Sequence, residues 1–327
     1  MKLDPKAVIN GLRAIQMENE WLAISILPDV GAKLYDLILK STGRNFLWHN
    51  PRILPQPYAI EANFDNYWCG GWDEGFPSCD ACDFNGESYP NLGELRSVHW
   101  SLDSADRNAG DLVARLSAFG PISPVRAEKT VTLAGASPFL KIRYEITNLG
   151  PTRLDFIWGT HPALAPTPHT VLRIPARTGI VGLSSDPVLG KPGERYSWPV
   201  LDTPAGKTDI SHARGIDAKI FCGHYATDLE AGWYAVEDSE TGQGFLLTFP
   251  VETCPYLWLW LVYGGWRGYH HVIVEPWTSY PVHLAEAVRT GTSRKLEPGA
   301  TFAAEVRATV YSRPESCEQA LRRVQNT

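Results

Sequence analysis

Strict alternation of apolar and polar residues along the chain predicts strands. In residues 140–147 (Leu-Lys-Ile-Arg-Tyr-Glu-Ile-Thr) every second side chain is apolar, and residues 302–310 alternate in the same way. A period of two places the apolar side chains on one face, which is typical of a half-buried strand of an antiparallel sheet. Residues 257–262 (Leu-Trp-Leu-Trp-Leu-Val) are apolar on both faces. This segment is predicted to be a strand buried between two layers.

Turn signals separate these strands at short intervals, as in Thr42-Gly43, 148–151, 238–243 and 297–299. The 28 glycines and 25 prolines fit many short strands joined by tight turns. Only residues 314–324 have a helical pattern, with apolar side chains on one face. No repeat or break in composition marks a linker. The prediction is therefore one all-β domain over 1–327, a large antiparallel β-sandwich of two facing sheets with a short C-terminal helix.

Charge narrows the possible partners. The formal net charge of the 327 residues is -6, and no basic run or stripe occurs. This argues against nucleic acid and against an anionic membrane surface as partners. The first residues do not form the continuous apolar core of a signal peptide, and the most apolar stretch, 256–263, is too short to span a bilayer. We expect a cytoplasmic protein, either a monomer or a homodimer.

Neither the cysteines nor the histidines favour a metal centre. Of six cysteines, only Cys79 and Cys82 have CxxC spacing, and no second such pair exists to complete a zinc site. This favours reduced thiols over a metal or redox centre. His270 and His271, considered with Glu275, are adjacent, so on a strand they point to opposite sides. We therefore predict no metal and no cofactor.

Aromatic residues are abundant, with 12 Trp, 13 Tyr and 11 Phe. Many of them will belong to the core, because aromatic side chains favour strands and bury large areas. Eight tryptophans, however, cluster near Gly, His, Asp and Glu residues: Trp68, Trp72, Trp100, Trp158, Trp258, Trp260, Trp266 and Trp277. This mixture suits a wet, concave site in which flat rings meet the faces of a sugar.

Seven segments, taken in order, resemble the galactose mutarotase-like superfamily, which includes aldose 1-epimerases and hexose-6-phosphate epimerases. They are 26–38 and 42–48 (first hairpin), 70–77 (a block of aldose-epimerase-like relatives), 90–96 (the place of the His-Gly motif), 156–163 (second histidine), 272–276 (catalytic glutamate) and 296–299 (closing turn). The resemblance spans most of the chain. It implies the β-supersandwich fold of that superfamily and a sugar ligand.

The resemblance also implies the catalytic groups, with Glu275 as base and His161 as acid. Mutarotation needs a base for the anomeric hydroxyl and an acid for the ring oxygen, without metal or nucleotide. Glu275 follows the apolar run 272–274 and precedes Pro276, and His161 precedes Pro162. These placements put both side chains at strand ends. From the residues alone, a salt-bridged surface glutamate and a core histidine bonded to backbone remain open.

One departure from the family concerns sugar binding. Where the family has His-Gly, this chain has Leu92-Gly93, and leucine can neither donate a hydrogen bond nor transfer a proton. Arg96 stands at the spacing where phosphosugar epimerase relatives keep an arginine. His99 is close enough in sequence to compensate for the lost histidine. If 96–100 is a strand, however, Arg96 and Trp100 share a face and His99 points away.

Four further residues complete the predicted sugar-binding set. Asp73 and Glu74 follow Gly70-Gly71-Trp72, a turn that would bring carboxylates close to a ligand. An acidic surface loop is the alternative for these two. Trp72 and Trp158 would supply flat rings beside them.

Three functions fit this set of residues. The first is a sugar mutarotase, an isomerase of carbohydrate metabolism that interconverts anomers by acid–base catalysis. The second is a phosphosugar or other anionic-sugar epimerase that uses Arg96. The third is a carbohydrate-binding protein without catalytic activity. Fold alone does not choose between them.

Overall fold

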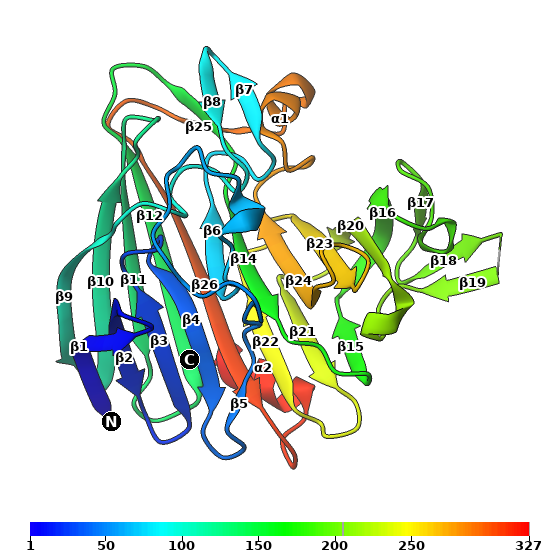
Figure 1. Cartoon of the computed structure of the whole chain (residues 1–327), viewed down its shortest axis with the longest axis horizontal. Coiled ribbons are helices and arrows are strands. Elements are labelled where there is room, and N and C mark those ends of the chain that lie inside the picture. Colours follow the sequence, from blue (N-terminus) through cyan, green and yellow to red (C-terminus); the bar gives the residue numbers. More distant parts are fainter. Residues whose placement is uncertain (205, 327) are drawn as a thin grey trace. The chain divides into compact units, whose positions relative to one another are not determined.

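The computed structural model describes residues 1–204 and 206–326, and most of its regular structure is antiparallel strand (Figure 1). The chain divides into two compact units. The first comprises 1–161 and 277–307, and the second comprises 162–276 and the C-terminal segment from Ala308. The division falls within three strands, β14 (Gly159–Leu164), β24 (His270–Trp277) and β26 (Thr301–Tyr311). The all-β prediction is confirmed.

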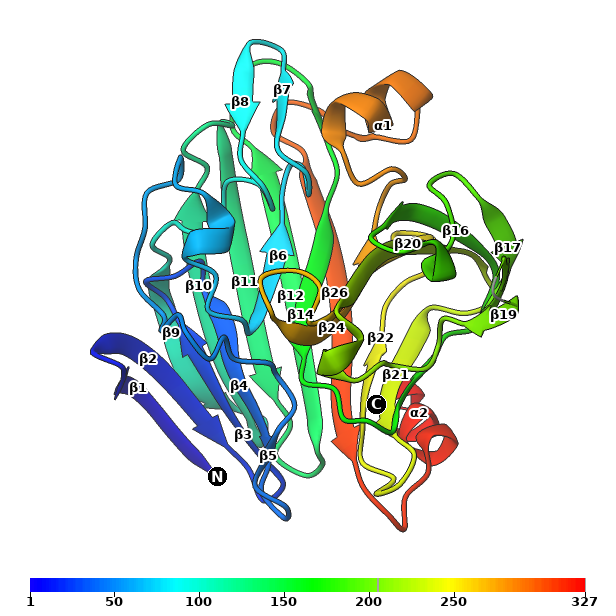
Figure 2. The same cartoon turned by 45° about the vertical axis from the view of Figure 1, so that its right-hand side comes forward.

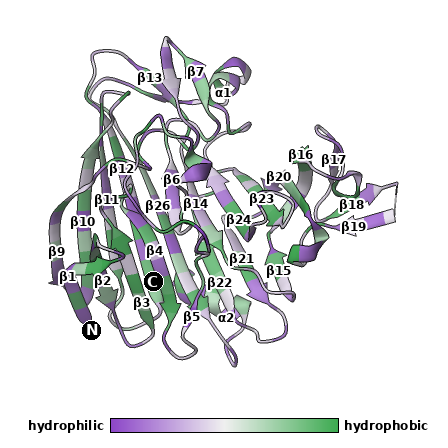
Figure 3. Cartoon of the chain, in the orientation of Figure 1, coloured by the Kyte–Doolittle hydropathy of each residue, from purple (hydrophilic) through white to green (hydrophobic). Residues whose placement is uncertain are grey.

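One sheet of the first unit is formed by the N-terminal strands. Its neighbours, in order, are β1 (Lys2–Ile9), β2 (Leu12–Glu18), β3 (Leu22–Leu27), β4 (Lys33–Leu39) and β6 (Trp72–Gly75), with β5 (Arg44–Asn45) paired to β4. Hydrophobic residues run along β2 and β3 (Figure 3). β4 pairs with β6 in a register that sets Leu34 opposite Trp72. The sheet thereby carries β6, the strand with the two predicted acidic residues.

A second sheet of this unit is a meander of four strands. These are β9 (Ser101–Asn108), β10 (Asp111–Phe119), β11 (Val125–Leu133) and β12 (Phe139–Asn148). The predicted alternation is confirmed in β12, where Leu140, Ile142 and Tyr144 are buried. The two sheets face each other, because Lys129 of β11 reaches Glu74 of β6 and the carbonyl of Ala32. The first unit is therefore a β-sandwich.

Smaller elements cap the first unit. They are the hairpin β7 (Cys82–Phe84) and β8 (Glu87–Tyr89), the pair β13 (Leu154–Phe156) and β25 (Arg294–Leu296), the 3-10 turn η1 (Phe64–Asn66) and helix α1 (Leu284–Thr290). The β7–β8 hairpin and α1 lie side by side (Figure 2). Sequence reasoning missed α1. Its seven residues, between an N-cap at His283 and Gly291, are too few to display a helical period.

The second unit contains two further sets of strands. One runs β24, β23 (Tyr256–Tyr263), β20 (Ile220–Leu229), β16 (Ala176–Ser184) and β17 (Arg195–Ser197); the other contains β15 (Thr170–Arg173), β21 (Trp233–Asp238) and β22 (Gly244–Thr248). The predicted strand at 257–262 is confirmed as β23, buried except for partial exposure of Trp260. A largely hydrophilic hairpin, β18 (Val200–Thr203) and β19 (Gly206–Asp209), is also present, with η2 (Pro187–Leu189) and η3 (Ile216–Ala218) (Figure 3).

The predicted C-terminal helix is confirmed as α2 (Cys317–Gln325). It begins with a capping box, in which the Ser316 side chain accepts from the Gln319 backbone and the Gln319 side chain accepts from the Ser316 backbone. Cys317, Ala320 and Val324 form its buried face. No helix in the described part of the chain is long and apolar enough to cross a membrane.

Two glycines in different turns, Gly31 between β3 and β4 and Gly43 between β4 and β5, test how tightly the β3–β4 turn is packed. Gly31 and Gly43 both adopt positive φ, +69° and +70°, but a Cβ on Gly31 would lie 2.3 Å from the Arg96 carbonyl oxygen. Around Gly43 no described heavy atom lies within 4 Å of that position. We expect Gly43→Ala to cost about 1–2 kcal/mol of unfolding free energy from backbone strain. Gly31→Ala should cost a further ~1–3 kcal/mol because its methyl group is overpacked. Denaturant unfolding of both variants checks this, and equal losses would contradict the packing.

Candidate functional site

Strand β6 presents two consecutive buried carboxylates. Asp73 and Glu74 are 2 % and 3 % exposed, and successive side chains of a strand point to opposite faces. The alternative of an acidic surface loop is wrong, because both residues are buried on β6, which begins at Trp72 directly after the Gly70-Gly71 turn. Each carboxylate meets its own buried lysine. Direct sugar binding by Asp73 and Glu74 stays a prediction.

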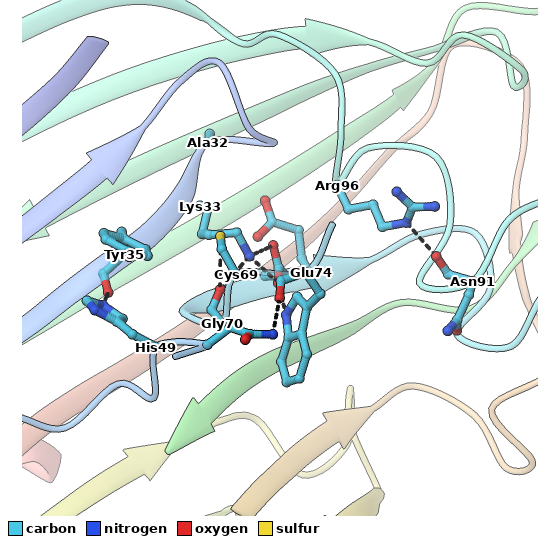
Figure 4. Close-up of polar contacts among 12 residues, drawn as sticks. Ala32, Lys33, Tyr35, His49, Cys69, Gly70, Glu74, Asn91 and Arg96 are labelled. Carbon is cyan, nitrogen blue, oxygen red and sulfur yellow. Dashed lines mark hydrogen bonds and ion pairs between the residues drawn. The ribbon is translucent and has the colours of Figure 1, made fainter. Parts of the chain in front are cut away.

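Asp73 forms an ion pair with Lys33 of β4. The Lys33 Nζ donates to both carboxylate oxygens of Asp73 and to the Gly70 carbonyl oxygen at 2.7 Å (Figure 4). The Trp68 indole N–H also donates to Asp73, at 3.3 Å. Burial, the largest single effect, would lower the pKa of Lys33, but the Asp73 carboxylate, followed by Cys69 and Tyr58, raises it, and the net shift is upward. Lys33 is therefore an ammonium ion at neutral pH.

Glu74 forms the second pair, on the other face of β6. The Lys129 Nζ lies 2.9 Å from Glu74 Oε2 and donates to the Ala32 carbonyl at 2.8 Å. The Tyr144 ring lies beside the ammonium, 5.3 Å away at its centroid. Burial raises the pKa of Glu74 to about 7, although Lys129 opposes the shift. This pair connects the two sheets of the first unit.

His161, on β14, is the imidazole of the cluster around Asp73. Its side chain is buried, and the Trp68 ring meets it edge-on with centroids 5.6 Å apart. Burial lowers the pKa of His161 to about 4; Asp73 opposes this shift and Lys33 adds to it. At neutral pH the ring is therefore uncharged.

Arg96 is buried close to this cluster. Its Nε donates to the Asn91 carbonyl oxygen (Figure 4). The guanidinium lies 5.3 Å and 5.0 Å from the ring centroids of Tyr58 and Phe64. Its Nη1 is buried and has no hydrogen-bond partner among the described residues. Residues 96–100 are all described and form no strand. The directions of Arg96 and His99 therefore cannot be taken from the alternation of side chains along a strand.

His99 lies in a different environment from Arg96. Its side chain is 49 % exposed and its Nδ1 lies 3.0 Å from Asp29 Oδ1, with Arg13 also bound to that carboxylate. Leu92, in place of the family histidine, is buried and packs on Gly75 beside Trp277. The structure therefore puts an apolar core contact where a polar ligand would stand.

Trp72 and Trp158 are both fully buried. The Trp72 indole donates to the Thr160 hydroxyl, and the Trp158 backbone N–H donates to the Thr278 hydroxyl at 2.9 Å. Trp277 lies flat against Gly159, where a Cβ would come within 2.2 Å of its ring. The Trp72–Thr160 bond holds the start of β6 and the start of β14 together. Stacking of Trp72 and Trp158 on a sugar stays a prediction.

Sequence reasoning missed Lys33 and Tyr58, and it counted Trp68 only among the clustered tryptophans. A signal for Lys33 existed, since it is a lone cation among apolar residues in 30–34, and buried charges require partners. The sequence could not show which residue pairs with Lys33, because Asp73 stands forty residues further along the chain. Tyr58 lies outside regular structure and could not be placed by periodicity.

Glu275 belongs to the second unit, on β24, and is 1 % exposed. Tyr234 of β21 is close enough to Glu275 to interact with its charge. Burial is the main cause of the raised pKa of the Tyr234 phenol, and the Glu275 carboxylate is the second cause. Elsewhere in this unit, the Trp258 ring lies over Gly182 and Gly223, where any Cβ would collide with it. Tyr225 packs against the same indole with centroids 4.4 Å apart.

A cavity of about 640 Å³ opens in the second unit near α2, and several of the charged side chains that line it are already paired. Arg173 bonds to Glu237 and Glu318 at 3.1 Å and 2.9 Å, and the Tyr311 hydroxyl donates to Glu237 at 2.6 Å. None of the predicted site residues lines it. The six cysteines, all described, are buried and form no disulfide, and the described residues contain no group of three or more His, Cys, Asp or Glu arranged to hold a metal.

Comparison with solved structures identifies the fold. A galactose mutarotase-like protein from Lactobacillus casei matches 91 % of this chain and 100 % of its own, with a TM-score of 0.64 and 16 % identity. The fold is that of the galactose mutarotase-like proteins. A protein from Klebsiella pneumoniae described as a candidate aldose 1-epimerase matches 97 % of this chain and 83 % of its own, with a TM-score of 0.71 and 13 % identity.

Two sequence comparisons add little to this. The sequence model of a domain of unknown function, DUF5107, matches residues 3–81, about a quarter of the chain. A search among curated proteins gave no match.

A protein from Synechocystis sp. PCC 6803 has a similar structure, with a TM-score of 0.68 and 20 % identity over 92 % of this chain and 96 % of its own. Identities this low establish the fold alone. The predicted β-sandwich of this superfamily is confirmed.

The Lys129–Glu74 pair gives a pH-dependent stability prediction. Lys129→Met leaves a buried glutamate without its cation, which should cost about 3–5 kcal/mol of unfolding free energy at pH 8. The folded-state pKa of Glu74 is already above its ordinary 4.5 and will rise further in the variant. The folded variant then binds a proton more tightly than the unfolded chain, so the cost should shrink as the pH falls to 5.

Urea unfolding of wild type and variant at pH 8 and pH 5 measures this difference. The double variant Lys129→Met/Glu74→Leu serves as the control, because it removes both charges and should recover most of the loss at pH 8. A loss that is the same at both pH values would contradict the assignment of Glu74 as the responsible group.

Proposed function

We propose that the protein is a mutarotase-like sugar 1-epimerase that interconverts the anomers of an aldose. The observation that carries the proposal is the buried His161, held beside Asp73, Lys33 and Trp68 in a galactose mutarotase-like fold. Glu275 supplies the second group.

In this proposal Glu275 removes the proton of the anomeric hydroxyl while His161 donates a proton to the ring oxygen. The bond from the anomeric carbon to the ring oxygen breaks, and an open-chain aldehyde forms. Rotation about the adjacent carbon–carbon bond turns the carbonyl, and the same two groups return the protons as the ring closes on the opposite face. The cycle needs neither metal nor cofactor.

The low pKa of His161 bears on its role as acid. A cation with a pKa of about 4 is scarce at neutral pH but is a strong proton donor, and a neutral ring is a good hydrogen-bond donor. Either form polarises the ring oxygen as negative charge develops there. Asp73 raises the pKa of His161 relative to burial alone, so the cation that donates the proton is less costly to form.

A second candidate is an epimerase of anionic sugars, favoured by the guanidinium Nη1 of Arg96, which is buried and has no hydrogen-bond partner in the part of the chain that the structure describes. Arg96 is held rigidly by Asn91, Tyr58 and Phe64, so little entropy is lost when it binds an anion. A carboxylate or phosphate on the substrate would fill the free position.

Anomer exchange measured by saturation-transfer NMR tests the catalytic proposal. Wild type should accelerate exchange of at least one aldose in a panel of neutral, acidic and phosphorylated sugars. Glu275→Gln and His161→Gln should each lower the rate at least about 100-fold, because each removes one proton-transfer group. Sugar binding, followed by tryptophan fluorescence, should persist in Glu275→Gln.

His224→Gln is the matched control for His161→Gln, since His224 is also buried with a pKa lowered by burial to about 4. It lies on β20 and bonds to Tyr196, and most of the exchange activity should survive its replacement. Binding of sugars without accelerated exchange in wild type would instead identify a carbohydrate-binding protein without catalytic activity.

The role of Arg96 has its own test. If the substrate is anionic, Arg96→Met should raise KM for the anionic sugar at least about tenfold, the equivalent of one lost charged hydrogen bond. KM for a neutral analogue should hardly change. The KM of both sugars decides the matter, and an equal change for the two would argue against anion recognition by Arg96.

A further inference from the structure

We propose that Lys33 and Asp73, linked through Trp68, are positioning residues that hold His161 in place and set its charge state. The catalytic meaning of this inference rests on the proposed function. The physical claim concerns only the first unit, where all four residues lie. It assigns to the buried pair a role different from that of the Lys129–Glu74 pair on the opposite face of the same strand.

Trp68 is the mechanical link. Its indole N–H donates to Asp73, and its ring contacts the His161 imidazole edge-on. Trp48 and Phe64 pack on the same indole, with ring centroids 5.0 Å and 5.7 Å away, so the ring has little freedom to turn. A shift of Asp73 is therefore transmitted to the imidazole. In this geometry Asp73 and Trp68 fix the position of the functional side chain of His161.

Asp73 has little capacity left for a sugar. Both of its oxygens accept from Lys33, one also accepts from Trp68, and its side chain is only 2 % exposed. Burying two charges is costly, and apolar residues of similar size often stabilise a core at least as well. Because this pair lies beside an imidazole, its two charges also act on the proton affinity of His161, which a pair that only stabilised the fold would not do.

The charges facing His161 within its unit have opposite signs. Asp73 favours the imidazolium, and Lys33 disfavours it. The other titratable groups coupled to the pair are Cys69, Tyr58, Glu74 and Tyr144, and burial raises the pKa of each, so the thiol and the two phenols are neutral at pH 7. None of these four is among the groups that shift the pKa of His161. Arg96 lies beyond them and acts on Tyr58. The field at His161 is thus the difference between one anion and one cation.

This arrangement predicts opposite effects from the two halves of the pair. Lys33→Met removes the cation and should move the midpoint of His161 protonation upward in pH. Asp73→Asn removes the anion and should move the midpoint downward, by about one pH unit or more in each case. Lys129→Met removes a buried lysine of the same kind from the opposite face of β6 and should leave the midpoint where it is.

The experiment is a pH titration of imidazole ¹⁵N shifts in ligand-free protein, with the His161 signal assigned from its loss in His161→Gln. Opposite displacements in Lys33→Met and Asp73→Asn, with none in Lys129→Met, support the proposal. Displacements in the same direction, no displacement, or an equal displacement in Lys129→Met would overturn it. Should Lys33→Met fail to fold, the isosteric Asp73→Asn and the Lys129→Met control still decide the outcome.

Anomer exchange of the same variants keeps this inference separate from the proposed function. If wild type accelerates exchange, the pH dependence of kcat/KM should move in the same direction as the His161 midpoint in each variant. If wild type accelerates no exchange while the opposite titration displacements are observed, the proposed function fails and the role of the pair in setting the charge of His161 stands.

Discussion

The structure of the first unit depends on the burial of two lysine–carboxylate pairs on consecutive residues of β6. Because Asp73 and Glu74 are neighbours on a strand, one pair must face the second sheet and the other must face away from it. The Lys129–Glu74 pair joins the two sheets. The Lys33–Asp73 pair ties β4 to β6 and places a charge beside His161. One short strand therefore serves both the core and the candidate site.

Around this strand the packing relies on close approach between glycine and tryptophan. Trp277 occupies the space above Gly75 and Gly159, so β6 and β14 are held by the same indole. Gly70 and Gly71, both with φ near +85°, let the chain turn into β6 while the Gly70 carbonyl accepts from Lys33. Backbone and side chain are thus ordered together, which keeps Asp73 and His161 in fixed positions relative to each other.

The sequence predicts the strands well because their signal is local. Alternation in β12 and the double apolar face of β23 are visible over eight residues, and the capping residues of α2 stand beside its apolar stripe. Helix α1 was not predicted, because its seven residues are fewer than two full periods of 3.6 residues. The partners of Asp73 and Glu74 were not predicted for a different reason. Lys33 and Lys129 lie forty or more residues away, and only the register of the sheets brings them to the carboxylates.

Leu92 shows what the altered motif means physically. It is buried at positive φ, and with Trp277 it fills the space over Gly75, so an imidazole at this position would have to enter an apolar core. The loss of a polar ligand is therefore coupled to tighter packing under β6. Under the proposed function, one hydrogen-bond donor fewer for a sugar ring would leave more of the polarisation of the ring oxygen to His161. That demand gives a physical reason for a buried anion and cation to be kept beside this imidazole, where each shifts its proton affinity in the opposite direction.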